Sequence, residues 1–578
     1  MAAQDFTNEL LVTVEGQPLA DDIRALLVQS VVDDSRTMPD LFVLRFRDAE
    51  NIVLEKSAIT IGTAITLTVA SNESHTPTPL LQGEVTALEK EHDSTGTFTV
   101  VRGLDRSHRL TRGRRVVGFQ EMTVSDVATK VARGAGLKVG QIDSTTTVHR
   151  QLSQGNVSDW DFLRRLAADI GAEVAVQNGA FELRRPTPAG NAPSRTAAIE
   201  DPLVLELGRN LLRMRAIVTS SEQVPEVEVR GWDVTAKRAV VGTAKAATRS
   251  AEIGTTPREL AGGFGAPMLV AADTPYLTQG EVDDAAAALA EQVAGGFAEL
   301  EGVVRGNPSV RAGTAVVLAG AGKPFDGKYA VTASRHVFEP DTGYTTWVTV
   351  SGGQDRTLWG LVDGAGTAAG PGGAGSGGLV IGQVSDNRDP DDLGRVRLTF
   401  PWLSDDFVSD WARTVQAGAG GGRGALVVPE VGDEVLVGFE QGSFQRPYVL
   451  GGLYNGVDKP DKGDVKLIDG NSGSVDRRAF VSRTGHRLEM VEAAAGAQGI
   501  VLRTGDGKLA VGLDQKQTEI TLHSDGSVTI SATGDVTVQS STGTLLLEGR
   551  EVQLKGKTGV TVDGGAKCSI SALQVTIN

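Results

Sequence analysis

The sequence is poor in several residue types that mark common protein classes. It has one cysteine, Cys568, in 578 residues, so no disulfide can form within the chain. No apolar run reaches the roughly eighteen residues that a membrane span needs. The first basic residue is Arg24, and Asp5 and Glu9 precede it, which is unlike a secretory or transit peptide. We therefore expect a protein that is made in the cytoplasm without a signal peptide.

Basic residues and catalytic motifs are also scarce. The chain holds 56 Lys and Arg against 72 Asp and Glu, a net charge of −16, which disfavours nucleic acid or an anionic membrane as a partner. It contains no His-Glu-x-x-His or Gly-x-Ser-x-Gly motif and no Cys/His ligand cluster. His486 has no second His or Cys at ligand spacing. The sequence therefore predicts no catalytic residues, no metal site and no cofactor.

The length and one glycine-rich stretch indicate several domains. A chain of 578 residues exceeds what one hydrophobic core supports, so we expect three or more domains. Eight of the fifteen residues from 364 to 378 are glycine, which predicts a flexible linker over 363–378. A match to the dinucleotide-binding fingerprint at Gly370, Gly372 and Gly375 is interrupted by a proline and follows no strand, so we reject it.

Residues 379–457 have the pattern of a small antiparallel barrel. Short apolar runs alternate with Asp-, Pro- and Gly-rich turns, and the predicted strands are Val380–Val384, Val396–Phe400, Ala425–Val428, Val431–Phe439 and Tyr448–Leu453. Five strands with a long loop between the second and third fit an OB-fold. The segment has eleven acidic residues against six Arg and no Lys, a net of minus five, which is the wrong sign for a groove that binds nucleic acid.

The run Asp389 to Gly394 in this segment reads as a turn. Proline fixes φ, aspartate bonds the local backbone and glycine accepts a positive φ. A calcium loop is the alternative, since three carboxylates fall within four positions, but Arg395 follows the glycine and no Glu closes the loop at the twelfth position. The sequence favours the turn.

The N-terminal part alternates strand-like runs with turns. The predicted strands are Leu10–Val14, Leu26–Val32, Leu41–Phe46, Ile59–Val69, Leu80–Ala87 and Phe98–Val101. The run Val101-Arg102-Gly103-Leu104-Asp105 is echoed 128 positions later by Val229-Arg230-Gly231-Trp232-Asp233. Because both copies follow a strand-like run and precede a basic turn, the echo favours two related barrels.

A helix and a basic cluster lie between the two copies. Ser158 is a good N-cap, the helix buries one face and Gly171 ends it; the residues of that face are Leu163, Leu166, Ala167 and Ile170. The basic cluster consists of Arg109, Arg112, Arg114 and Arg115. It is either an anion site or, as is commoner for such runs, a solvated face or ion-pair rim.

The last sixty residues carry a regular repeat. Apolar residues recur as spaced pairs about every eight positions, namely Ile520 and Leu522, Val528 and Ile530, Val536 and Val538, Leu545 and Leu547, Val552 and Leu554, Val560 and Val562, Cys568 and Ile570, Val575 and Ile577. We call these residues the octad stripe. Such spacing predicts short strands that each turn a narrow apolar stripe inward. Sixteen side chains at roughly 2 kcal/mol each cannot offset the ordering of sixty residues at roughly 1–2 kcal/mol each, so one chain alone should not fold here, whereas three could cover the stripe mutually.

Several segments resemble one known family. The OB segment, with Pro401-Trp402, Asp410-Trp411-Ala412-Arg413 and the run PEVGDEV from Pro429, closely resembles the OB domain of VgrG-type spikes of contractile injection systems. RGLDRSHRLTRGRR, FQEMTVSDVATKVARGAGL and SDWDFLRRLAADIGAEVAVQNGAFELRRP resemble the hub of phage-tail and VgrG proteins. The run from Phe480 to Leu488 resembles the start of the spike shaft in the same family.

The resemblance implies a mainly β, multidomain fold. We expect a hub of two related β-barrels with helical insertions over 1–362, the linker, the OB-fold over 379–457, a connector and shaft beginning over 458–518, and a triple-stranded β-helix over 519–578 in a homotrimer. The octad stripe, apart from Cys568, then forms the trimer shaft core. Cys568 is expected to be a small buried apolar residue.

The resemblance also implies a structural function. We expect a hub and spike at the tip of a contractile machine, bound to a hexameric tube protein and to baseplate proteins, with possible effector cargo, in a particle that is cytoplasmic or released. The alternatives are a tail-associated enzyme, either a cell-wall hydrolase or an effector-bearing spike, and a freestanding OB-type binding module. The high Ala and Gly content and the lack of a catalytic insert favour a phage-tail-like system. Since the sequence stops on its last strand unit, we expect a PAAR-like tip protein at the apex, contacting Val575, Ile577 and Asn578.

Overall fold

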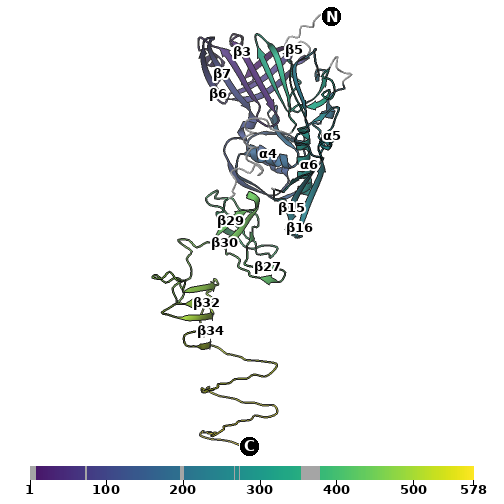
Figure 1. The fold of residues 1–578 in the computed structure, drawn as a ribbon. Helices are drawn as coiled ribbons and strands as arrows, with labels where there is room; N and C mark the ends of the chain where they lie inside the picture. The colour runs from purple at the N-terminus through teal and green to yellow at the C-terminus, as the bar shows by residue number, and fades with distance from the viewer. Residues whose placement is uncertain are drawn as a thin grey trace. The chain divides into compact units, whose positions relative to one another are not determined.

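A computed structural model describes residues 8–71, 74–194, 201–265, 267–272, 274–352 and 378–577. The chain divides into two compact units, Met1–Asp458 and Lys459–Asn578, and each is described by itself (Figure 1). The predicted linker over 363–378 lies outside the described residues except for Gly378.

The first unit is built on a continuous sheet of eleven strands. Their order is β14 (Leu211–Val218), β19 (Ala298–Arg305), β23 (Gly343–Val350), β22 (Ala333–Glu339), β3 (Leu27–Ser35), β4 (Leu41–Arg47), β7 (Gly96–Asp105), β6 (Ser74–Asp93), β5 (Ala64–Ser71), β1 (Asn8–Val14) and β2 (Gln17–Pro18). The short helices α1 (Asp21–Arg24) and α2 (Val53–Ser57) interrupt its N-terminal half. The strands expected before residue 110 are present, but β5 begins at Ala64 because the Thr60 N–H donates to Thr63 Oγ1 and forms a turn first.

Two hydrophobic cores share this sheet. The first includes Phe42 and Leu67 from the N-terminal strands. The second includes Phe297 and Tyr329, beneath a four-stranded sheet whose order is β13 (Val204–Glu206), β20 (Ala315–Ala319), β21 (Gly327–Ala330) and β17 (Ala251–Glu252). Pairing of β3 with β22 joins the two halves. The buried Arg311–Asp34 ion pair, with 2.7 Å between Nε and Oδ2, ties them again.

The five-residue echo does not mark equivalent strands of these two cores. Its first copy ends β7, whereas its second ends β15 (Glu226–Asp233), which pairs with β16 (Arg238–Lys245) and β18 (Leu269–Ala271) in a separate sheet. That sheet packs on α6 (Gln279–Gly295) and forms a small core of its own. In both copies the final Asp accepts a hydrogen bond from the backbone N–H two residues ahead. The echo therefore reflects a shared way of ending a strand.

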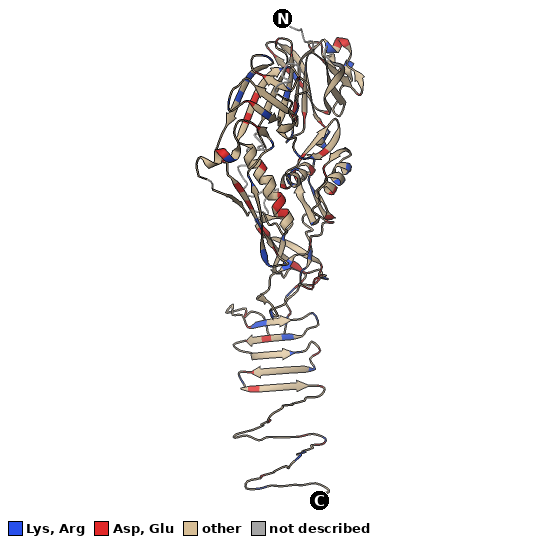
Figure 2. Ribbon diagram, turned by 90° about the vertical axis from the view of Figure 1, so that its right-hand side faces the viewer, with Lys and Arg blue, Asp and Glu red and all other residues tan. Residues whose placement is uncertain are grey.

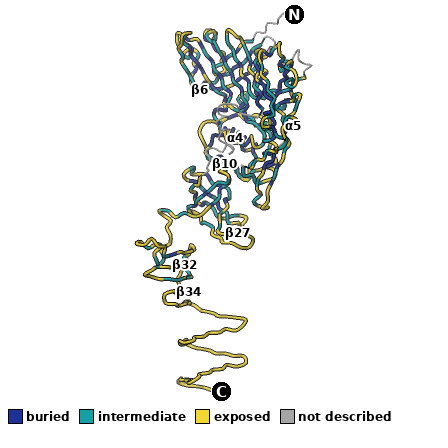
Figure 3. Tube along the Cα trace, in the orientation of Figure 1, coloured by how far each residue is buried: buried dark blue, intermediate teal, exposed yellow. Residues whose placement is uncertain are grey.

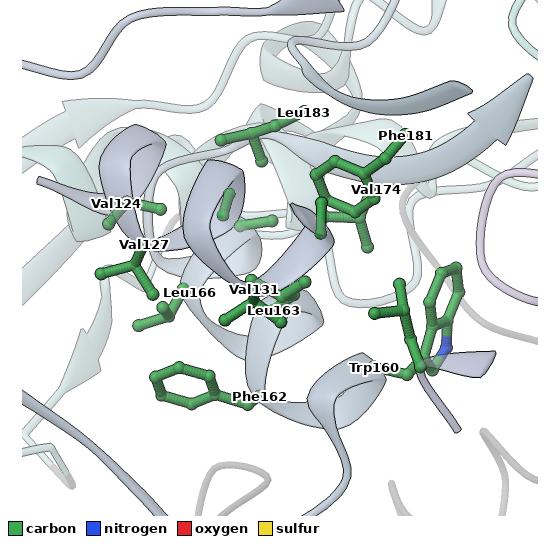
Figure 4. Packing of buried hydrophobic residues seen from close by; sticks show 14 of the residues in the cluster. Val124, Val127, Val131, Trp160, Phe162, Leu163, Leu166, Val174, Phe181 and Leu183 are labelled. Carbon is green, nitrogen blue, oxygen red and sulfur yellow. The ribbon is translucent and has the colours of Figure 1, made fainter. Parts of the chain in front are cut away.

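The helical insertion has its own core (Figure 4). It contains α3 (Val124–Gly134), α4 (Asp159–Asp169), and the strands β8 (Arg115–Met122), β9 (Lys138–Ile142), β10 (His149–Val157), β11 (Glu173–Gln177) and β12 (Ala180–Arg184). Ser158 caps α4 as expected, since its Oγ accepts from the Asp161 N–H at 3.1 Å. Phe162, Leu163 and Leu166 are buried against α3, and Gly171 at φ +64° follows the helix. A further helix, α5 (Pro257–Gly262), follows β17.

The basic cluster is partly an ion-pair rim. Arg109 and Arg115 bind Glu84 and Asp159, with 3.2 Å from Arg115 Nη1 to Asp159 Oδ2. Arg112 is exposed. The rim interpretation therefore holds for these two paired arginines.

The OB segment forms a five-stranded sheet, but one strand is not the one expected. The order is β25 (Arg397–Thr399), β24 (Val380–Asp386), β29 (Glu434–Phe439), β30 (Pro447–Gly452) and β26 (Arg413–Thr414), with a small hairpin of β27 (Ala419–Gly420) and β28 (Arg423–Gly424). The predicted strand Ala425–Val428 is wrong, because this run has no strand pairing and leaves Leu426 and Val427 exposed. Its place is taken by β26, which pairs parallel with β30. With the hub sheets, this arrangement confirms the mainly β, multidomain class.

The run from Asp389 to Gly394 is a turn, as the sequence favoured. The Asp389 carboxylate is 4% exposed and accepts hydrogen bonds from the backbone N–H groups of Asp391, Leu393 and Arg395. The guanidinium of Arg395 also donates to it, at 3.0 Å from Nε to Oδ2. The carboxylate is thus occupied by this chain's own donors. The side-chain hydrogen bond from Arg395 holds the pKa of Asp389 well below its usual range.

We expect Asp389→Asn to destabilise the OB-fold by about 2 kcal/mol, because the amide cannot accept all of these hydrogen bonds. Since the folded-state pKa of Asp389 is lowered, its stabilisation is present above the unfolded pKa and is lost as the pH falls through the folded value. Urea unfolding between pH 7 and pH 3 should therefore show a smaller acid-induced loss in the variant. The control is Asp392→Asn, an exposed position at φ 52° that asparagine also tolerates; an equal effect of both substitutions would contradict the prediction.

The second unit begins with a connector and continues into a five-stranded antiparallel sheet. Its strands follow one another in sequence order, namely β31 (Arg477–Val481), β32 (Arg487–Glu492), β33 (Gln498–Arg503), β34 (Leu509–Asp514) and β35 (Glu519–Ser524). Figure 2 shows them lying side by side. From residue 527 to residue 577 the described chain contains no further strand or helix.

Candidate functional site

One face of the five-stranded sheet carries two columns of apolar side chains, and Arg478 on β31 stands at the head of the first column, opposite Met490. Cross-strand pairing aligns Met490, Ile500, Leu513 and Ile520 in one column and Phe480, Leu488, Leu502, Val511 and Leu522 in the other. We call these nine residues the apolar face. They are 36–77% exposed, so within the described residues nothing covers them. An exposed apolar surface of this kind marks an interaction site.

The opposite face of the same sheet is covered at one end. Arg477 and Glu489 have side chains that are 3% and 5% exposed, and Arg477 Nη1 donates to Glu489 Oε1 at 2.8 Å. Asp461 from the connector accepts from the same nitrogen at 3.1 Å. Buried charges need partners of this kind. The connector thus covers the Arg477 end of this face, and the apolar face is left open.

The predicted shaft core begins within this sheet. Ile520 and Leu522 lie on β35 and extend the two columns of the apolar face. All fifteen predicted core residues are 51–89% exposed in the single chain (Figure 3); they are Ile520, Leu522, Val528, Ile530, Val536, Val538, Leu545, Leu547, Val552, Leu554, Val560, Val562, Ile570, Val575 and Ile577. Cys568 is exposed as well. A single chain does not bury these side chains, and their burial in a trimer remains a prediction.

Seven residues of the apolar face escaped the sequence reasoning, which placed the shaft core from residue 520 onwards. They are Phe480, Leu488, Met490, Ile500, Leu502, Val511 and Leu513. A signal was available, because spaced apolar pairs begin at residues 488, 500 and 511. Their separations are longer than eight since hairpin turns connect these strands, and a search for a fixed period passes over them.

The described residues show neither a metal site nor a membrane-spanning helix. Among the residues that the structure describes, no group of three His, Cys, Asp or Glu side chains is placed to hold a metal ion. His486, for which the sequence offered no second metal ligand, accepts a hydrogen bond at Nδ1 from the Gly505 N–H at 3.1 Å. In the described ranges, no helix has the length and apolar character needed to cross a membrane. The tip residues Val575 and Ile577 are exposed, and Asn578 lies outside the described residues.

Two known domain families match the chain. The Alg8 N-terminal domain matches residues 49–339, which is half of the chain and most of the hub. The type VI secretion system and phage-baseplate injector OB domain matches residues 380–454. The second match coincides with the five-stranded OB sheet.

Curated relatives match shorter stretches. The type VI secretion system spike protein VgrG2a of Pseudomonas aeruginosa is 33% identical over 85 residues, which are 14% of this chain and 10% of that protein. The spike protein VgrG3 of Vibrio cholerae is 28% identical over 148 residues, 25% of this chain and 14% of that protein. The chain thus aligns with a small fraction of these relatives' length.

A solved structure matches nearly the whole fold. One chain of a Francisella PdpA–VgrG complex superposes with a TM-score of 0.52 over 89% of this chain and 88% of that chain, at 10% sequence identity. At that identity the likeness concerns the fold. It extends across hub, OB-fold and C-terminal unit in one chain.

Proposed function

The chain belongs to the VgrG-type spike proteins and carries the Alg8 N-terminal domain, and from this premise we propose that it is the structural hub and spike at the tip of a contractile tail-like injection machine. In this role it joins tube and baseplate to a puncturing shaft. The observation that carries the proposal is the apolar face, which continues into the octad stripe. Three copies around one axis would cover both surfaces and pair the free strand edges.

The trimer is the first consequence to test. Light scattering on the purified protein should give three times the chain mass of 60.4 kDa, because the exposed residues of the apolar face cannot be buried by one chain. Mild denaturant should lower the mass measured by light scattering, as the trimer dissociates, before the OB-fold unfolds. The reason is that the apolar face and the OB-fold lie in different compact units of the chain. A stable monomer of 60.4 kDa at micromolar concentration would overturn the proposal.

The partners follow from the same role. In this proposal the hub binds the hexameric tube protein and baseplate proteins, a PAAR-like tip protein sits on Val575, Ile577 and Asn578, and the spike can carry effector cargo. The Francisella structure of similar fold is a complex of PdpA and VgrG, which supports partner binding by proteins of this fold. The protein acts without catalytic residues of its own, as part of an assembled particle. No described observation favours the tail-associated enzyme or the freestanding binding module.

A further inference from the structure

The OB-fold is docked on the hub of its own chain through an apolar contact. Val116 on β8 packs against the OB core, which also holds Phe407 and, at its edge, Phe444. The rings of these two phenylalanines lie 5.0 Å apart between centroids. Gly155 on β10 lies directly under Phe444. We call these four residues the hub–OB seam.

Polar contacts frame the seam on both sides. Gln151 Nε2 donates to the carbonyl of Val408 at 3.4 Å, and Gln441 Nε2 donates to the carbonyl of Ala272 at 2.8 Å. The Arg150 guanidinium lies 3.4 Å from Asp410 Oδ1. Each contact joins a hub residue to an OB residue, so the docking is fixed in orientation as well as in position.

Charges across the seam add a further link. Burial raises the pKa of Glu281 on α6, but the hydrogen bond with His149 and the positive charge of Arg446 on the OB side outweigh it and lower the pKa to about 2. Glu281 Oε1 lies 3.3 Å from His149 Nδ1. The hub carboxylate therefore stays ionised opposite an OB arginine at neutral pH.

Gly155 is the residue that allows the close approach. A Cβ at this position would lie 2.8 Å from Phe444 Cδ1 and 3.0 Å from its Cγ. Because the Cγ atom is close to the backbone, rotation of the ring alone would not relieve the overlap, and the whole Phe444 side chain would have to move. Gly118 on the neighbouring strand offers a contrast, since the nearest atom to its Cβ would be 3.5 Å away. One glycine of this strand pair is needed for the seam, and the other has room for a methyl group.

We propose that the hub–OB seam is the mechanical coupling that carries axial thrust from the hub to the spike. The inference rests on the proposed function. The covalent connection runs through residues 353–377, outside the described residues. A compressive force is transmitted between two domains only through a packed interface. Among the described residues, the seam and its polar frame supply that contact between hub and OB-fold.

The test compares Gly155→Ala with Gly118→Ala in the full-length protein. Spin labels at Lys237→Cys and Asp405→Cys, in a Cys568→Ser background and in trimers where labelled chains are diluted with unlabelled ones, report the hub-to-OB distance within one chain. Wild type and Gly118→Ala should give one narrow distance distribution. In Gly155→Ala, overpacking should shift the docking equilibrium by roughly tenfold or more and broaden the distribution. Assembled particles carrying this variant should contract normally but lose most of their penetration of a target envelope, whereas Gly118→Ala particles keep it.

Each other outcome is decisive. If Gly155→Ala broadens the distance but particles penetrate as well as wild type, the seam carries no thrust and the proposal is wrong. If Gly155→Ala and Phe444→Ala both keep the narrow distribution, the seam does not hold the OB-fold and the proposal is equally wrong. Particles that contract and penetrate without any copy of this chain would instead overturn the proposed function itself, so the two failures are distinguishable.

Discussion

Leu522→Asp is expected to dissociate the trimer. Leu522 belongs to both the apolar face and the octad stripe, and in the single chain it is 59% exposed. If three copies meet there, the substitution places three carboxylates close together in an apolar environment. Each costs on the order of 3 kcal/mol or more through desolvation and repulsion, and the burial of three leucines, roughly 2 kcal/mol each, is lost as well.

The control for this substitution is its neighbour on the same strand. Thr521 pairs with Gly512 on the opposite face of the sheet, so Thr521→Asp should leave the mass by light scattering at that of a trimer. Lowering the pH below about 4 should partly restore the Leu522→Asp trimer, because a protonated carboxyl is cheaper to bury. If Leu522→Asp stays trimeric and heat-resistant at pH 7, the apolar face is not the interface.

Removal of Leu573 to Asn578 is expected to abolish binding of the tip protein. Val575 and Ile577 are 51% and 89% exposed, and we propose that they form the base on which a PAAR-like protein sits. Co-expression of the intact chain with such a protein should yield three copies of this chain to one tip protein. The truncated chain should remain trimeric and elute alone, since most of the octad stripe is intact.

A milder variant separates the apolar contact from chain length. Gln574 and Thr576 alternate with the two apolar residues in sequence, so a strand at the apex would point them to the other side. Val575→Asp with Ile577→Asp should therefore lose the tip protein, and Gln574→Asp with Thr576→Asp should keep it. Retention by the truncated chain, or density for assembled particles with a bare apex, would rule out this site.

The sequence was sufficient where a pattern is local and regular. The Ser158 cap and the buried face of α4 were predictable because capping and periodicity lie within one turn or two of helix. The octad stripe was visible because its apolar pairs recur every seven to nine residues, with no longer interruption. The apolar face above it was missed at Leu488, Ile500 and Val511, where hairpin turns of unequal length hide the same alternation.

Other features depend on contacts that no local pattern contains. Ala425–Val428 has the composition of a strand, yet its backbone finds no partner and β26 pairs with β30 instead. The hub–OB seam joins Gly155 to Phe444 across nearly three hundred positions. A glycine in a strand indicates that another group approaches the backbone closely, but the sequence does not identify Phe444 as that group.

The five hairpin-linked strands β31–β35 are synthesised after the hub and OB-fold and before the octad stripe beyond β35, which bears on how the spike assembles. Beyond β35 the described chain has no strand partner of its own, so in the proposed trimer that stretch would become ordered only after copies have met. The hub and OB-fold leave the ribosome first and can fold as they emerge. Strands β31–β35 form through contacts between sequence neighbours, which are quick to make. In the proposed trimer, registration of three such sheets would be the nucleus, and winding would proceed from it towards Ile577. The yield of finished spikes would then be set by how often three nascent chains encounter one another.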